Sequence, residues 1–187
     1  MWKTDRSLDE QRDEFSRRRF LAMPLAGALA WTVVGLAGAF GRPVVAVWSL
    51  FIGTGSITYV GMLLSRYTGE NFLDKTRPRN TFDTLFFLTV AMSLLVYAIA
   101  LPFFLRDYTS LPLSVGILSG LMWIPLSWVI QHWIGLFHGL GRTVLVLAAW
   151  YVFPQHRFVV IPLVIVAIYL ITIRVLEMRW RALQPVP

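Results

Sequence analysis

Hydrophobic and polar positions occur along this chain in long blocks, with six apolar runs separated by short polar turns. An apolar helix of about 20 residues is long enough to cross the hydrocarbon core of a bilayer, which is about 30 Å thick. The pattern therefore predicts an all-α integral membrane bundle of about six transmembrane helices. We place them at residues 20–41, 43–65, 82–105, 112–130, 133–153 and 158–177.

The start of the fifth helix follows from its length. Only 11 residues separate Arg142 from Pro154, which is too few to cross about 30 Å at about 1.5 Å per residue. The helix must therefore begin near Trp133. This start places His138 and Arg142 in its first three turns.

The basic side chains gather on one side of the predicted membrane. Of 17 Lys and Arg residues, 14 lie in the N-terminal segment, the loop before the third helix, the fourth-to-fifth turn and the C-terminal end. Loops rich in Lys and Arg stay in the cytoplasm, so we expect both termini there. This distribution explains the net charge of +7 without a nucleic-acid partner. We expect a basic cytoplasmic segment at 1–19, the membrane domain at 20–181 and a disordered end at 182–187.

The composition supports a lipid-facing surface. The chain is 57% hydrophobic and 14% charged, whereas a soluble domain carries about 25% charged residues. It contains no cysteine, which excludes disulfides, thiol nucleophiles and cysteine-ligated metals. We expect no cofactor and no metal site.

The N-terminal segment also fits a different pattern. Ser16–Leu21 has the S-R-R-x-F-L spacing of twin-arginine export signals, and Ala37–Ala39 offers an A-x-A cleavage site. The apolar run that follows is long for a signal peptide and leads directly into further membrane spans. We therefore interpret the segment as a first membrane helix with a positive flank.

The second helix carries a face of small and hydroxyl side chains. At 100° per residue, Thr54, Thr58, Gly61 and Ser65 fall on one narrow face. Such faces allow close helix packing, and one of them could join two copies in a homodimer. The alternative is a polar wall that lines a solute path.

Polar residues also cluster in and after the fourth helix. Pro125 lies in mid-span, where it removes an amide donor and leaves the Leu121 carbonyl without its helical partner. The candidates that follow are Ser127, Gln131, His132, His138 and Arg142. His138 and Arg142 share a helix face, whereas His132 and His138 point apart, which argues against a two-histidine metal site. Arg142 either extends to headgroups at the cytoplasmic surface or belongs to a site.

Asp83 is the only carboxylate close to the interior of a predicted span. It lies in the first turn of the third helix, where a negative charge suits the helix dipole. Asp83, His138 and Arg142 are all predicted toward the cytoplasmic side, so an ion pair or proton-linked cluster is geometrically possible. No nucleotide-binding or hydrolase motif accompanies them.

Several short segments resemble an uncharacterised family of small bacterial polytopic membrane proteins. They are Gly53–Gly55, Gly61–Arg66, Leu111–Leu113, Gly116–Leu118 and Trp123–Pro125. The resemblance covers about residues 45–165. It implies a multi-pass protein of a bacterial inner membrane and supplies no activity.

Three functions remain open. The leading hypothesis is binding or transport of a small solute or lipid headgroup through the bundle, and basic residues at a cytoplasmic mouth (Arg66, Arg79 and Arg142) favour an anion. The second is a non-catalytic partner or assembly factor whose basic loops hold another protein or anionic lipids. The third is a small intramembrane lipid-modifying enzyme that uses His138 and Asp83. We expect the role to be non-catalytic.

Overall fold

The computed structural model describes residues 6–72, 74, 76 and 78–184. These residues form helices and turns, and no strand occurs among them. Six helical segments are long and apolar enough to cross a membrane, which confirms the predicted all-α bundle. The six segments cover Ala22–Phe40, Pro43–Tyr67, Thr81–Arg106, Ser110–Ile130, Ile134–Val152 and Arg157–Ala182.

The described residues form eleven helical elements, of which all but α1 belong to the spans. In chain order these are α1 (Leu8–Ser16), α2 (Ala22–Phe40), α3 (Pro43–Tyr67), α4 (Thr81–Leu95), α5 (Tyr97–Arg106), α6 (Ser110–Leu118), α7 (Trp123–Ile130), α8 (Ile134–Leu136), η1 (Phe137–Gly141), α9 (Arg142–Val152) and α10 (Arg157–Ala182). α2, α3 and α10 each form a whole span as a single helix. The other three spans consist of two or more pieces.

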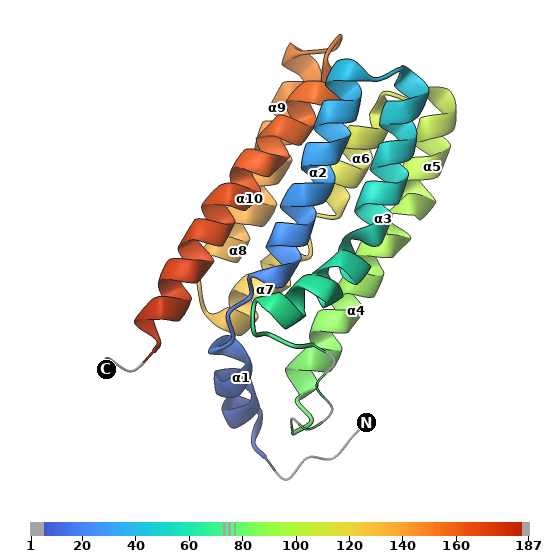
Figure 1. The fold of residues 1–187 in the computed structure, drawn as a ribbon. Coiled ribbons are helices and arrows are strands. Elements are labelled where there is room, and N and C mark those ends of the chain that lie inside the picture. The colour runs from blue at the N-terminus through green and yellow to red at the C-terminus, as the bar shows by residue number, and fades with distance from the viewer. Residues whose placement is uncertain (1–5, 73, 75, 77, 185–187) are drawn as a thin grey trace.

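The helices close into one bundle (Figure 1). α2 lies between α3 and α10 and contacts both, while α10 also contacts α6 and α9. α1 lies outside the spans at one end of the bundle, where the C-terminal end of α10 is also found. We call this the α1 end. Its location in the cytoplasm stays a prediction.

Glycines bring α2 and α10 into close contact. A Cβ atom on Gly38 would collide with the backbone carbonyl of Phe158, and one on Gly27 would collide with the ring of Tyr169. The absence of side chains at these positions lets the two helices pack without lipid between them.

Three spans have interruptions near their centres, and that of the third span is at Val96, between α4 and α5. The fourth is broken at residues 119–122, between α6 and α7. There Pro125 has no amide hydrogen for the Leu121 carbonyl, which accepts a hydrogen bond from the Ile124 N–H at 3.1 Å. The fifth span contains the π-helix η1, a geometry that often marks functional positions in helices.

The N-terminal segment, for which only a basic flank was predicted, contains α1. One predicted boundary needs correction. The last helix extends to Ala182, beyond the predicted end at residue 177, so the disorder expected from 182 is wrong at its first residue. Glu177 stabilises this extension through an ion pair with Arg181 one turn later, at 2.9 Å.

Some sequence predictions fall outside the described residues. They concern the basic positions Lys3, Lys75 and Arg77 and the residues 185–187 of the expected disordered end.

Candidate functional site

α1 forms because its first turn is capped on both sides. The Ser7 hydroxyl accepts a hydrogen bond from the Glu10 N–H, and the Glu10 carboxylate accepts one from the Ser7 N–H. This reciprocal pair satisfies two amide donors that a helix start otherwise leaves free. The capped helix directs Gln11 and Phe15, which are one turn apart, into the protein.

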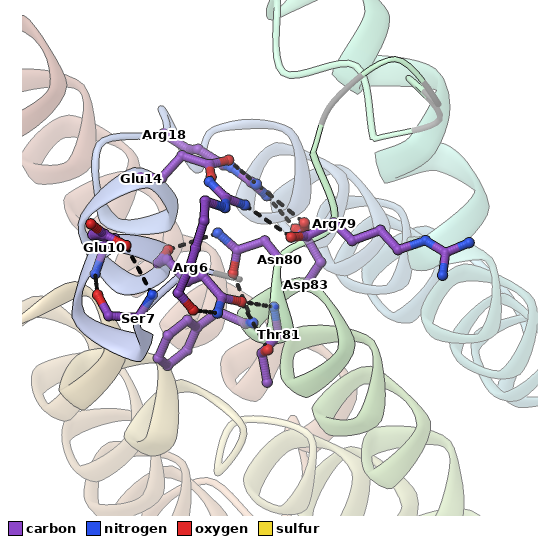
Figure 2. Close-up of polar contacts among 11 residues, drawn as sticks. Arg6, Ser7, Glu10, Glu14, Arg18, Arg79, Asn80, Thr81 and Asp83 are labelled. Atoms are coloured by element: carbon purple, nitrogen blue, oxygen red, sulfur yellow. Dashed lines mark hydrogen bonds and ion pairs between the residues drawn. The ribbon is translucent and has the colours of Figure 1, made fainter. Parts of the chain in front are cut away.

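Gln11 joins α1 to the start of α4, where Figure 2 labels its partners Asn80 and Thr81. Its side-chain oxygen accepts hydrogen bonds from the backbone N–H and the hydroxyl of Thr81, both at 2.8 Å. Its backbone carbonyl accepts a hydrogen bond from the Asn80 amide at 2.7 Å. Asn80 also caps α4 by accepting from the Phe82 N–H. The two helix starts are thus joined by one buried polar network.

An ion cluster lies beside this network. Arg18 pairs with Asp83 through both of its terminal nitrogens and with Glu14 at 3.2 Å. Arg6 also pairs with Glu14. Figure 2 shows Arg18 and Glu14 facing Asp83 across the gap between α1 and α4.

These contacts shift the pKa values of the charged groups. Partial burial acts to raise the pKa of Glu14, but hydrogen bonds and charge from Arg6 and Arg18 outweigh it, so the pKa lies below its ordinary value. Burial acts to lower the pKa of Arg18, and the bond to Asp83 outweighs it, so that pKa is raised. Both shifts favour the charged forms of Glu14 and Arg18.

A cavity of about 1390 Å³ lies next to the cluster. It is bounded by α1, the segment between α1 and α2, the loop between α3 and α4, the first turns of α4 and the end of α10. We call it the α1 cavity. Its aromatic lining consists of Phe15, Phe20, Phe72, Phe86, Phe87 and Trp180, and its charged lining of Arg6, Arg18, Arg19, Glu70, Asp74, Arg79 and Asp83.

Glu70 and Arg19 hold the base of the α1 cavity. The Glu70 carboxylate accepts hydrogen bonds from the N–H groups of Leu21 and Ala22 at 2.8 and 2.7 Å, which places a negative charge at the start of α2. Arg19 pairs with Glu177 of α10 at 2.8 Å, and this contact raises the pKa of Arg19. Glu70 and Arg19 therefore line the α1 cavity while already held in place by partners.

A second polar cluster lies at the centre of the bundle. His138 and Arg142 are both 0% exposed. Arg142 contacts the His138 ring at 3.4 Å, the Tyr169 hydroxyl at 3.3 Å and the Ser119 hydroxyl at 3.1 Å. On its other side, His138 contacts the Thr172 hydroxyl at 2.9 Å. These residues come from the α6–α7 break, from η1 and α9, and from α10.

Asp83 does not belong to the His138–Arg142 cluster. It pairs with Arg18 at the α1 end, whereas Arg142 lies near the middle of its span. Two interpretations of Arg142 are therefore wrong. It does not extend to headgroups, and it does not form a mouth with Arg66 and Arg79, because the fifth span begins far enough before it to bury it.

The residues expected around the fourth-to-fifth turn have structural roles. Gln131 ends α7 in a left-handed conformation (φ 50°), and with its amide oriented for hydrogen bonding it accepts from Arg12. The Ser127 hydroxyl donates to the His132 carbonyl at 2.5 Å. The His132 ring accepts from the Ile134 N–H at 3.3 Å. None of these contacts joins them to His138.

The polar face of α3 is divided among different neighbours. Thr54 donates to the Leu50 carbonyl and pairs with the Tyr97 hydroxyl of α5. Gly61 packs against Met23 of α2. Ser65 is buried and accepts from the Phe72 N–H at 3.2 Å. Thr58 lies half-buried between them. This face packs helices together, and its residues are not among those that line the α1 cavity.

Sequence reasoning missed several residues that build both sites, among them Gln11, Glu14, Arg18, Ser119 and Tyr169. A signal for α1 was present, because Ser7-x-x-Glu10 has the spacing of a capping box. The hydroxyls of Ser119 and Tyr169 gave no comparable signal, since each becomes notable only beside Arg142.

The comparisons with known proteins give a family but no activity. No curated protein and no solved structure matches the chain. A family model, described as a family of unknown function (DUF7010), matches residues 8–179. The match runs from α1 into the last turn of α10, so it includes most of the α1 cavity and all of the His138–Arg142 cluster. The chain therefore belongs to DUF7010, a family of unknown function.

Proposed function

We propose that this protein binds a phospholipid in the α1 cavity, with the lipid headgroup among the charged residues of α1 and α4. The observation that carries the proposal is the cavity itself. It combines aromatic and charged side chains at the end of the bundle where α2 and α4 begin and where α3 and α10 end. A membrane lipid has the same division between an apolar and a polar part.

The position of the α1 cavity matches the boundary between hydrocarbon and water. α2 begins at Ala22, α4 begins at Thr81, and α10 ends near Trp180. Tryptophan is common at headgroup depth, and Trp180 lies under the Arg19 guanidinium at 4.6 Å. A headgroup can therefore reach the α1 cavity from its own level in the bilayer.

The charges that line the α1 cavity nearly balance. Among the described residues they comprise four arginines and three carboxylates. A lining of one sign would select a ligand of the opposite charge, whereas a mixed lining suits a headgroup with both signs. We therefore propose a zwitterionic phospholipid, with its phosphate near the arginines and its ammonium near Asp83. Anionic lipids at the basic loops remain a separate proposal.

The first test is native mass spectrometry of the purified protein titrated with phosphatidylethanolamine. Thr84 lines the α1 cavity and is exposed, so Thr84→Trp should fill the space without removing a core contact. We expect affinity to fall about tenfold, which is about 1.4 kcal/mol. Leu88→Trp is the matched control, since Leu88 is one turn along α4, is 58% exposed and does not line the α1 cavity.

Equal lipid affinity in Thr84→Trp and Leu88→Trp would contradict a binding site in the α1 cavity. Phosphatidylglycerol serves as the comparison lipid. If it binds more tightly than phosphatidylethanolamine, the ligand is anionic and the zwitterionic assignment is wrong.

We also propose that the α1 end faces the cytoplasm of a bacterial cell, with the six spans in the inner membrane. The basic residues of the N-terminal segment and of the loop before α4 support this orientation. Reporter fusions at residue 187 test it. Activity of a reporter that works only outside the cytoplasm would reverse the orientation.

The enzyme alternative loses its basis in this geometry. It required His138 and Asp83 to act together, and the two belong to separate clusters with separate partners.

A further inference from the structure

Arg142 carries a charge at the centre of the membrane-spanning bundle. It lies next to the middle residue of the 19-residue span Ile134–Val152, about 12 Å along the helix from the first residue. Within the described part of the chain, no carboxylate pairs with it; its ring neighbours are Trp31 at 5.4 Å and Tyr169 at 5.5 Å. A buried charge in a membrane span is costly and marks a functional position by default.

The hydrogen bonds assign the proton on His138. The Thr172 hydroxyl donates its only hydrogen to the Ile168 carbonyl at 2.8 Å. It must therefore accept from His138 Nδ1, which carries the proton. His138 Nε2 then has a free lone pair and accepts from Arg142. The imidazole in this arrangement is neutral.

The other acceptors of Arg142 are neutral as well. The Ser119 hydroxyl donates to the Val115 carbonyl at 2.5 Å and so accepts from Arg142. Tyr169 accepts through its hydroxyl oxygen. The Nε–H of Arg142 has no acceptor among the described residues. Arginine stays protonated in proteins, so the guanidinium holds a positive charge inside a neutral shell, and its Nε–H is an unused donor.

Two interruptions of regular helix meet at this charge. Gly120, in the break between α6 and α7, approaches so closely that a Cβ atom there would lie 2.8 Å from Arg142 Cδ. Gly139, in η1, would likewise bring a Cβ atom within 2.7 Å of Ile124 in α7. Broken helices near the bilayer centre are a recurrent setting for solute sites in membrane proteins.

We propose that Arg142 binds a small anion, a halide or a carboxylate group, in a state in which the α6–α7 break has moved away from η1. The anion takes the place that a carboxylate side chain would fill in an ordinary buried ion pair. Ser119 and Tyr169 supply further hydrogen bonds to it. In the structure Arg142 is fully enclosed, and in the proposal this arrangement is the closed state, which an anion cannot enter. This site is distinct from the α1 cavity and does not depend on lipid binding there.

The absence of cysteine allows a direct test with a single thiol. Ser119→Cys places it beside the guanidinium. In proteoliposomes, the thiol is treated with two membrane-impermeant reagents, one that carries a sulfonate and one that carries a quaternary ammonium group. The reaction rate of each reagent is normalised to its rate with the unfolded variant. We expect the anionic reagent to react about tenfold faster than the cationic one. We also expect the anionic reagent to react more slowly in sodium chloride than in sodium gluconate.

Variants of Arg142 attribute the preference to its charge. In the Ser119→Cys background, Arg142→Lys should keep the preference, and Arg142→Gln should abolish it. Ser127→Cys, in α7 but outside the His138–Arg142 cluster, should show none. The proposal is overturned if the thiol of Ser119→Cys reacts with neither reagent or with both equally. It is also overturned if the preference survives Arg142→Gln or appears in Ser127→Cys.

Discussion

Arg18 and Asp83 form an ion pair between residues 65 positions apart, and this pair joins the segment after α1 to the first turn of α4. Asp83 was predicted to lie in the first turn of its helix, and it does. It does not join His138 in a cluster; it pairs with Arg18 and anchors the N-terminal segment. The contact closes one side of the α1 cavity, so the stability of α1 and the shape of the cavity depend on the same residues.

Loss of the Arg18–Asp83 pair should loosen α1 but leave the bundle folded. Asp83 is more than one-third exposed, so we expect a coupling free energy of about 0.5–1 kcal/mol. A double-mutant cycle with Arg18→Gln and Asp83→Asn, read by thermal unfolding in detergent, measures it. If the two single substitutions change the free energy of unfolding additively, the ion pair contributes nothing to stability.

Gln11 should matter more than the ion pair because it is 1% exposed. Gln11→Ala removes the acceptor for two donors of Thr81. Because Thr81 is exposed, water can replace that acceptor, so we expect a loss of about 0.5–1.5 kcal/mol for each hydrogen bond. We expect faster proteolysis within α1 and a lower unfolding temperature. Asp9→Asn, on the exposed side of α1, is the control and should change little. An effect of Gln11→Ala no larger than that of the control contradicts the docking role.

Docking of α1 should weaken in acid. The folded-state pKa of Glu14 is depressed by Arg6 and Arg18, so its contribution is present above the ordinary glutamate pKa, about 4.3. That contribution is lost as pH falls through the depressed value. A nitroxide on Asp9→Cys should therefore become more mobile below about pH 4.

In the Glu14→Gln background the same label should be mobile at neutral pH, with a weaker dependence on pH. A label whose mobility follows pH identically with and without Glu14 would assign the transition to another carboxylate.

The packing of the helices predicts opposite effects for two glycines. Gly38→Ala places a methyl group against the Phe158 carbonyl, so we expect a loss of about 1–3 kcal/mol from overpacking between α2 and α10. Gly55 has no atom within 4 Å of an added Cβ. Gly55→Ala should therefore stabilise α3 by up to about 1 kcal/mol through helix propensity. Thermal unfolding of both variants distinguishes them, and equal destabilisation would contradict the packing.

The six spans were predictable because apolar length decides membrane crossing, and all six predicted positions overlap observed spans. The burial of Arg142 was not predictable from the sequence. Its place in the first turns of the fifth helix suggested a side chain that reaches headgroups, but more than two helical turns lie between it and the start of the span at Ile134. A neutral shell from neighbouring elements then holds it. Such a shell depends on how helices rotate against each other, which hydropathy does not determine.

The α1 cavity was also beyond sequence reasoning. Its walls come from segments at both ends of the chain and from the loop before α4, and each wall is ordinary by itself. Arg18 and Arg19 look like a positive flank that sets membrane orientation. Only their separate partners, Asp83 and Glu177, show that the flank also builds a cavity.

Photo-crosslinking with a phosphatidylethanolamine that carries a diazirine near its headgroup tests the central claim most directly. The protein is reconstituted with this lipid, irradiated and digested, and the adducts are mapped by mass spectrometry. Lipid binding in the α1 cavity predicts adducts concentrated on α1 and the first turns of α4, at residues such as Phe15 and Thr84, and their loss in Thr84→Trp. Adducts spread evenly over the lipid-facing sides of α3 and α5, and unchanged in Thr84→Trp, would contradict it.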